Sequence, residues 1–222
     1  ATVGEIDGNR SGVSARLAAM TTDADPLARD PLPLRGRSVV VAGVSRRAGI
    51  GHATACRLAA YGANVCCHHF SPHDADQPWG GDDIDAVLEG VRAHLVADAQ
   101  LIDVHADLTD PAAPAQVIDT ATAAFGHVDA VVANQAMSGS DGTLAEVTAA
   151  DLDRHWAVDA RASLLLAQAF VARHDASRSG AIVLLTSGQH RGPMPGEVAY
   201  VAAKAAIAGV TATLADELAP KN

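Results

Sequence analysis

The stretch SVVVAGVSRRAGIGHATACRLAAYGANVCCHHF, residues 38–70, decides the fold of this chain. It opens with the apolar run Ser38–Ala42, which predicts a buried strand, and continues into a loop with three glycines, GVSRRAGIG. Residues 50–61 then have helical spacing and end at Gly62, a typical helix C-cap, before a second expected strand at Asn64–His69. Because a glycine loop between a strand and a helix lets a phosphate approach the helix N-terminus, this order favours nucleotide binding.

The alternation of strands and helices continues down the chain. Five strands joined by helical crossovers predict an α/β fold, a doubly wound parallel sheet of the Rossmann type in a single domain, with helices on both faces. In such sheets the ligand lies at the carboxyl ends of the strands. Further strands are expected at 100–105, 128–133 and 180–186, and helices at 82–99, 113–125, 149–173 and 198–218.

Composition and charge limit the classes of function. The chain has 222 residues, 49% of them hydrophobic and only 3% aromatic, which predicts an aliphatic core. Its net charge of −10 argues against a nucleic-acid partner, whose phosphates need a basic surface. No apolar run approaches the ~20 residues of a membrane helix and no secretory signal is visible, so no membrane is expected. Three cysteines, an odd number, indicate a reducing compartment and hence a cytoplasmic protein.

The first 36 residues lie outside this regular pattern. They contain several glycines, aspartates and prolines, which discourage regular structure. We interpret 1–36 as an N-terminal extension, in which residues 14–20 can form a short helix, and 37–222 as the dinucleotide-binding domain.

Arginines in the glycine loop bear on the choice of cofactor. Arg46 and Arg47 lie inside the loop, and the second strand is followed by Phe70 and Ser71 without a carboxylate. A site for NAD usually has an acid at this point, which binds the ribose 2′-hydroxyl and would repel the extra phosphate of NADP. The missing acid and the two arginines therefore predict NADP(H) in preference to NAD(H).

A second motif lies at the carboxyl end of the fifth expected strand. Ser187 follows the strand, and Tyr200 and Lys204 stand four residues apart on the next helix, so they share a face. An ammonium group ~4 Å from a phenol stabilises the phenolate by roughly 4 kcal/mol at an effective dielectric of about 20, or about 3 pKa units. Such a shift brings a phenol toward neutrality, where proton transfer is efficient.

Together with the glycine loop and Asn134 after the fourth strand, this motif resembles the short-chain dehydrogenase/reductase family. The resemblance covers nearly everything from about Gly36 onward. The stretches SPHDADQPWG and TSGQHRGPMPGEVAY are similar to a bacterial subgroup labelled 3-oxoacyl-(acyl-carrier-protein) reductases.

The resemblance implies reduction of a carbonyl, with a 3-oxoacyl group as one option, to a secondary alcohol by hydride transfer. Tyr200 would be the general acid/base, Lys204 would support it and bind the nicotinamide ribose, and Ser187 would orient the carbonyl. The residues expected to contact the cofactor, besides Tyr200 and Lys204, are Gly43, Ser45, Arg46, Arg47, Ile50, Gly51, Phe70, Ser71, Asp107, Leu108, Asn134 and Ala136.

The sequence departs from the family pattern in several places. Ala42 replaces the usual threonine, two extra residues separate the first two glycines, and the Asn-Asn-Ala-Gly run is reduced to ANQA. Asp159 occupies the position of the family's catalytic Asn, and we expect it to be the fourth catalytic residue. Its carboxylate would partly offset the effect of Lys204, which predicts an active protein whose pH profile differs from that of Asp159→Asn.

The printed sequence ends after the helix expected at 198–218, whereas the family continues with two more strands and a loop that covers the substrate. The domain is therefore expected to be C-terminally incomplete as given. Its fifth strand should then be an exposed edge.

Two classes of function stay open at this point. The first is an NADP(H)-dependent reductase of a small-molecule or acyl-carrier-bound carbonyl. The second is a non-catalytic nucleotide-binding regulator on the same fold, which the altered ANQA run and Asp159 favour and the retained serine, tyrosine and lysine oppose. A carrier protein is acidic, and the candidate docking residues are Arg154, Arg161, Arg173 and Arg178.

The helices bear on subunit assembly, and the histidines bear on metal binding. The Ala- and Leu-rich helices expected at 149–173 and 198–218 resemble those that pair subunits in the family, so a homodimer or homotetramer is expected. Neighbouring strand residues point to opposite faces, so His68 and His69 are not expected to share a metal ion, and no metal site is expected.

Overall fold

The computed structural model describes residues 29–96, 98–139 and 141–219. The short helix expected at 14–20, and most of the expected extension 1–36, lie outside the described residues. From Leu32 onward the chain forms one unit. The segment before the first strand is tied to this unit, since the backbone N–H of Leu34 donates to the carbonyl of Tyr61 at 3.0 Å.

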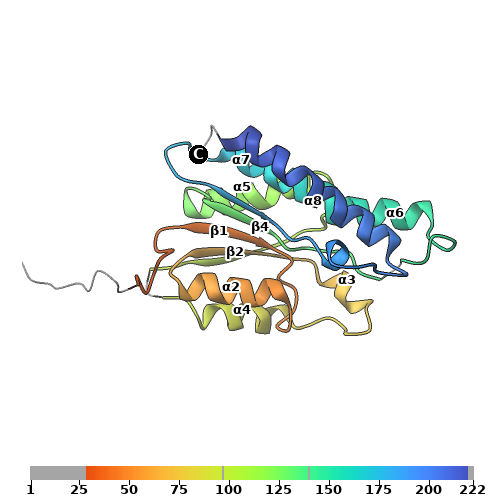
Figure 1. The fold of residues 1–222 in the computed structure, drawn as a ribbon. Coiled ribbons are helices and arrows are strands. Elements are labelled where there is room, and N and C mark those ends of the chain that lie inside the picture. The colour runs from red at the N-terminus through yellow and green to blue at the C-terminus, as the bar shows by residue number, and fades with distance from the viewer. Residues whose placement is uncertain (1–28, 97, 140, 220–222) are drawn as a thin grey trace, which may run out of the picture. The chain divides into compact units, whose positions relative to one another are not determined.

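Five parallel strands form the sheet, as the sequence predicts. Their order across the sheet is β3-β2-β1-β4-β5, with β1 between β2 and β4 (Figure 1). The order of winding therefore switches between β1 and β4, the point at which such sheets bind ligands at the carboxyl ends of their strands. The strands are β1 (Ser38–Ala42), β2 (Asn64–His69), β3 (Leu101–His105), β4 (Ala130–Ala133) and β5 (Ala181–Leu184).

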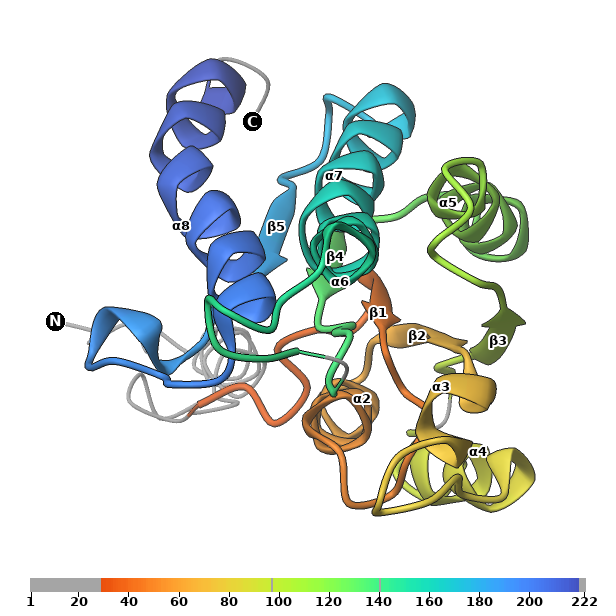
Figure 2. The same ribbon diagram turned by 90° about the vertical axis from the view of Figure 1, so that its right-hand side faces the viewer.

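Helices cover both faces of the sheet, which makes it doubly wound (Figure 2). One face carries α2 (Ile50–Ala60) and α4 (Ile84–Arg92), and the other carries α5 (Ala113–Phe125), α7 (Ala162–Arg173) and α8 (Val198–Leu218). Shorter helical segments lie between them: α3 (Ser71–Ala75), α6 (Ala149–His155), a π-helical turn at Trp156–Arg161 and a 3₁₀ turn at Gly188–His190.

Two expected helices differ from the observed ones. The helix expected at 82–99 begins after the cap residue Asp83 and ends at Arg92, because the chain then tightens into turns in which His94 and Leu95 donate to carbonyls three residues back. The helix expected at 149–173 is divided by the π-helical turn. Its start is fixed by a capping box between Thr148 and Asp151.

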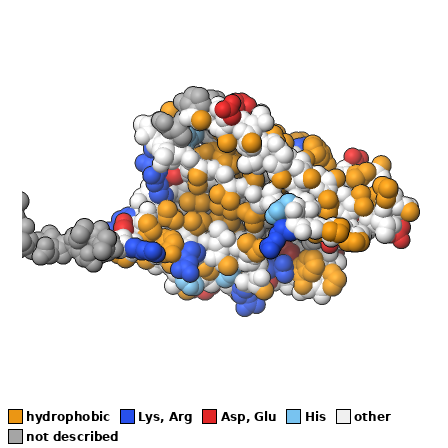
Figure 3. All heavy atoms as spheres, in the orientation of Figure 1, with side chains coloured by type: hydrophobic (Ala, Val, Ile, Leu, Met, Phe, Trp, Pro, Cys, Tyr) orange, Lys and Arg blue, Asp and Glu red, His pale blue; other side chains and the backbone are white. Residues whose placement is uncertain are grey.

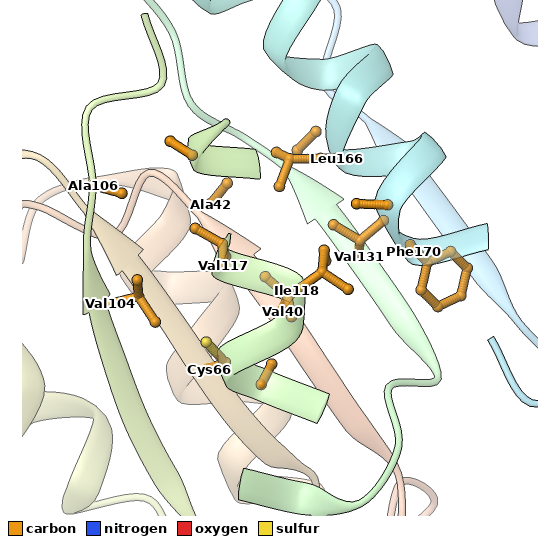
Figure 4. Packing of buried hydrophobic residues seen from close by; sticks show 14 of the residues in the cluster. Val40, Ala42, Cys66, Val104, Ala106, Val117, Ile118, Val131, Leu166 and Phe170 are labelled. Atoms are coloured by element: carbon orange, nitrogen blue, oxygen red, sulfur yellow. The ribbon is translucent and has the colours of Figure 1, made fainter. Parts of the chain in front are cut away.

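The core is aliphatic on both faces of the sheet. In β1, Val40 and Ala42 face α5 and α7, whereas Val39 and Val41 face α2 and α4, which explains the unbroken apolar run of this strand. Figure 4 shows side chains of α5 and α7 packed against the strands; the labelled residues include Val117, Ile118, Leu166 and Phe170. Cys66 and Cys67 are small buried members of the core, and burial raises the pKa of the Cys66 thiol to about 12.

The strand β5 is the open edge of the sheet, as expected. Within the described residues it pairs with β4 alone, and Val183 is 46% exposed. A groove of about 590 Å³ follows this strand between α7 and α8, with Phe170, Ile182 and Leu214 in its wall. Figure 3 shows hydrophobic side chains gathered on the face that includes β5 and α8.

The expectation that no apolar run approaches membrane length is wrong for α8. Of the described helices, this one alone is long and apolar enough to cross a membrane. Length and composition of this kind are shared by core helices. The helix contributes Ala203 and Ile207 to a buried cluster with Ala160, so its inner face serves packing.

Candidate active site

The glycine loop is shaped by how closely the backbone of β1 approaches that of β4. Gly43 has φ +81°, and a Cβ there would lie 2.8 Å from the Cα of Gln135. A Cβ on Gly51 would lie 2.2 Å from the carbonyl oxygen of Gly43. The amide of Asn134 donates to the carbonyls of Ala42 and Gly43 at 3.2 and 3.0 Å. Glycine is therefore required at both positions, and Asn134 holds the loop to β4.

A cleft of about 490 Å³ lies at the carboxyl ends of the strands, beside this loop. Gly43 and Gly49 line it without side chains, which suits a ligand that approaches the backbone closely. Five expected cofactor contacts do not line it: Arg47, Gly51, Ser71, Tyr200 and Lys204. The expected contacts that do line it are Gly43, Ser45, Arg46, Ile50, Phe70, Asp107, Leu108, Asn134 and Ala136.

His68 ties three strand ends together beneath the cleft. Burial lowers its pKa to about 4, so the ring is neutral near pH 7. Its Nε2 lies 2.9 Å from the carbonyl of Ala106, to which it donates, and its Nδ1 accepts from the backbone N–H of Gly43 at 3.3 Å. The neighbouring His69 points elsewhere, with Nε2 at 3.1 Å from Asp103. The described residues contain no cluster able to hold a metal ion.

Both loop arginines form ion pairs with carboxylates of this chain, which the sequence did not indicate. Arg46 is 3.0 Å from Asp74 and lies over the ring of Trp79, 5.0 Å from its centroid. Arg47 is 2.7 Å from Asp82 and, by hydrogen bonding to it, holds the pKa of that carboxyl well below its usual range. No acid stands at Phe70 or Ser71, directly after β2, but acids further along the chain pair with both arginines.

Lys204 and Tyr200 face the carboxyl end of β5 from the first turns of α8. Lys204 is buried, and its Nζ donates to the carbonyl of Leu185 at 3.1 Å. That Nζ lies 5.7 Å from the centre of the Tyr200 ring. Ser187 stands two residues beyond Leu185, at the start of the 3₁₀ turn. Burial lowers the pKa of Lys204, and the nearby carboxylate of Asp159 opposes this effect.

Asp159 is fully buried beside this pair, in the π-helical turn. Its Oδ1 accepts from the backbone N–H of Met137 at 2.8 Å and lies 3.8 Å from Nζ of Lys204. Its Oδ2 lies 3.0 Å from Nδ1 of His155. Helices accommodate π turns mostly at functional sites, where they redirect a side chain. The structure therefore brings the expected residue Asp159 to Lys204 and adds a histidine.

Asp141 is a second residue that sequence reasoning missed. Its Oδ1 accepts from the backbone N–H of Gly142 and Ala199 at 2.8 and 2.9 Å, and its Oδ2 accepts from that of Tyr200 at 2.8 Å. Burial alone would raise the pKa of Asp141, but these hydrogen bonds outweigh it and lower the pKa. The carboxylate caps the first turn of α8 and so orients Tyr200.

These features define a class of protein, an oxidoreductase with a nucleotide-binding fold. The chain belongs to the short-chain dehydrogenase family, whose sequence profile matches residues 37–222. Members of this family bind a nicotinamide cofactor, and the glycine cradle of this chain fits such a group.

Relatives and solved structures agree with the family. An uncharacterized oxidoreductase of Bacillus subtilis, YjdA, is 34% identical over 184 residues, which cover 82% of this chain and 68% of the relative. An NADPH-dependent aldehyde reductase-like protein of Arabidopsis thaliana is 32% identical over 195 residues, which cover 86% of this chain and 70% of the relative. A short-chain dehydrogenase of Burkholderia cenocepacia in complex with NADP is 32% identical, with a TM-score of 0.70 over 85% of this chain and 71% of that one.

Proposed function

We propose that this protein reduces a small-molecule carbonyl to a secondary alcohol with NADP(H), using Tyr200 as the proton donor. The observation that carries the proposal is the buried ammonium of Lys204, fixed by Leu185 and 5.7 Å from the Tyr200 ring. A cation held so close favours the phenolate that remains after proton donation.

The residues of this chain divide the work as follows. The hydroxyl of Tyr200 donates its proton to the carbonyl oxygen, and Ser187 orients that oxygen. When bound, the reduced nicotinamide supplies the hydride. Asp141 keeps the first turn of α8 in place, so the hydroxyl of Tyr200 is carried on an ordered helix.

The choice of NADP(H) rests on Arg46. Its side chain lines the cleft and is a third exposed, and an exposed ion pair such as that with Asp74 is weak enough to be exchanged. A 2′-phosphate can then replace the carboxylate as the partner of Arg46. Arg47 points to Asp82 and does not line the cleft, so it is a matched control.

Arg46→Ala should weaken NADPH binding about 10-fold and leave NADH binding within about 2-fold, because one charge-assisted contact to the phosphate is lost. Arg47→Ala should change neither affinity appreciably. Fluorescence titration of both cofactors measures this. Equal losses for NADPH and NADH in Arg46→Ala would contradict the preference for NADP(H).

The substrate is proposed to be a free small molecule because the expected docking arginines are engaged. Arg154 pairs with Asp151, and Arg161 donates to the carbonyl of Thr109. Arg173 and Arg178 likewise pair with aspartates, Asp119 and Asp129. An acidic carrier protein would have to displace several of these partners at once, whereas a 2′-phosphate has to displace only Asp74. A 3-oxoacyl thioester remains one member of the panel of carbonyl compounds that should be tested.

The experiment is NADPH oxidation with that panel, comparing the full-length protein with its Tyr200→Phe variant. Turnover that falls about 10²- to 10⁴-fold in the variant, with unchanged NADPH affinity, supports the proposal. Cofactor binding without turnover of any carbonyl compound would instead indicate a non-catalytic nucleotide-binding regulator.

We further propose a cytoplasmic homodimer or homotetramer. Its location is supported by three free cysteines, of which two are buried in the core. Its assembly is supported by the apolar surface of α6 and the π-helical turn, where Leu152 and Trp156 are exposed beside α8. Light scattering that finds a monomer at micromolar concentration would refute the assembly.

A further inference from the structure

We propose that His155 is a buried cation that neutralises Asp159, so that the charge of Lys204 acts undiminished on the proton donor of the reaction. This inference deepens the proposed function and rests on it. It assigns His155 the part of a positioning residue, which acts on the chemistry through the charge of its neighbours.

The geometry of the ring requires two protons. His155 is the last residue of α6 and is 1% exposed. Its Nδ1 lies 3.0 Å from Oδ2 of Asp159, and its Nε2 lies 3.1 Å from the carbonyl oxygen of Gly139. Carboxylate and carbonyl oxygens accept hydrogen bonds and cannot donate them, so each ring nitrogen must carry a proton to form its bond. The imidazolium is the form that satisfies both contacts.

A neutral ring would be costly at this place. It would set a nitrogen lone pair against an oxygen in a buried region, which leaves polar atoms unpaired. Burial by itself lowers the pKa of His155, but the hydrogen bond and charge of Asp159, with the Gly139 carbonyl and Asp141, outweigh it and raise the pKa.

The charges that face this ring come from three elements. Asp159 belongs to the π-helical turn, and Asp141, 3.9 Å from Nε2, belongs to the loop after β4. From α8, the ring of Tyr200 lies edge-on with 6.1 Å between centroids, and Lys204 contacts the other oxygen of Asp159. On its own helix, the nearest cation, Arg154, is paired with Asp151.

The two carboxylates are thus balanced by two cations, His155 and Lys204. If His155 loses its charge, the cluster becomes net negative. The carboxylate of Asp159 then offsets part of the positive potential of Lys204 at Tyr200. The phenolate of Tyr200 is then less favoured, because a like charge nearby opposes its formation. Removing the carboxylate of Asp159 as well should cancel this effect, since Lys204 then balances the remaining carboxylate of Asp141 and the cluster is neutral again.

The experiment follows the ionisation of Tyr200 directly, in the protein without cofactor. The chain has two tyrosines, so Tyr61→Phe leaves Tyr200 as the sole source of tyrosinate absorbance. In this background His155→Gln should raise the pH at which Tyr200 ionises by about one unit. Adding Asp159→Asn should return it close to the starting value. The exposed His94 is the control, and His94→Gln should change nothing.

Several outcomes overturn the inference. If Asp159→Asn fails to return the ionisation of Tyr200 toward its starting pH in the His155→Gln variant, His155 has a merely structural role, and no shift in a folded His155→Gln variant would mean no role. In the unmutated protein, nitrogen NMR should find the His155 ring doubly protonated at pH 7, and a neutral ring would refute the proposal even if the variants fail to fold. These readouts need no turnover, so they stand apart from a failure of the proposed reaction.

Discussion

Opposite charges meet in two regions of this molecule, and the solvent makes them different. Around the glycine loop, Arg46 and Arg47 pair with Asp74 and Asp82 at positions that water reaches. Around Lys204, the charged groups are almost completely buried. An exposed pair is screened and readily exchanged, whereas a buried one strongly disfavours the removal of a single partner. The first region can therefore accept an outside anion, and the second keeps its charges fixed.

The sharpest way to break this comparison is to remove one carboxylate from each region. Asp159→Ala leaves Lys204 and His155 without their shared partner, and we expect it to lower the free energy of unfolding by about 3 kcal/mol. Asp82→Ala leaves Arg47 without its ion-pair partner, but Arg47 is exposed to water. The loss of unfolding free energy should therefore be a small fraction of that in Asp159→Ala. Urea unfolding measures both. Similar losses in the two variants would show that burial does not separate the regions.

Close backbone contacts, more than charges, should determine the conformation of the glycine loop. Gly51→Ala places a Cβ 2.2 Å from the carbonyl oxygen of Gly43, which forces the loop to move. We expect a loss of about 1–3 kcal/mol in unfolding free energy and at least about 10-fold weaker NADPH binding.

Gly209→Ala in α8 is the matched control, since a Cβ there meets open space. It should stabilise the helix by about 0.5–1 kcal/mol and leave NADPH affinity unchanged. A Gly51→Ala variant that binds NADPH normally would show that the close approach of the loop is unimportant.

Asp141 sharpens the comparison because its carboxylate is mostly buried and accepts its hydrogen bonds from backbone N–H groups, with the ring of His155 at 3.9 Å. Its pKa is lower in the folded than in the unfolded protein, so it contributes stability above the unfolded value of about 4 that is lost as the pH falls through the folded value. Asp141→Asn should cost about 1 kcal/mol at pH 7 and progressively less toward acid pH. A difference that stays constant down to pH 3 would contradict a role for the charge.

Much of the fold could be predicted because its signals are local. The apolar run of β1, the glycine loop and the helix end before Gly62 each depend on a few neighbouring residues, and the bounds of β1 and β2 are confirmed. The C-cap itself is Tyr61, and Gly62 follows it with φ +93°. The π-helical turn could not be predicted, because it arises from packing between α6, α7 and α8 and not from a distinctive composition.

The part of the site that could be predicted is the pair of residues whose spacing lies within one helix. Tyr200 and Lys204 share a face of α8, and Asp159 does meet Lys204. Asp141, Asp74 and Asp82 were missed because their contacts join residues far apart in sequence. The pairing of Arg47 with Asp82, for example, spans 35 positions. His155 was missed although it stands only four residues before Asp159, a helical spacing that could have indicated the contact.

The place of β5 at the sheet edge has a consequence for the lifetime of the catalytic arrangement. Strand β1 is hydrogen-bonded on both sides, whereas β5 is bonded only to β4 within the described chain. Amide hydrogen exchange should accordingly be slower in β1 than in β5, or in the other edge strand β3, since an edge strand can open without disturbing the centre of the sheet. Lys204 is anchored to the carbonyl of Leu185, which directly follows β5. The lysine that supports the proposed proton donor is thus anchored beside an edge strand and not at the centre of the sheet.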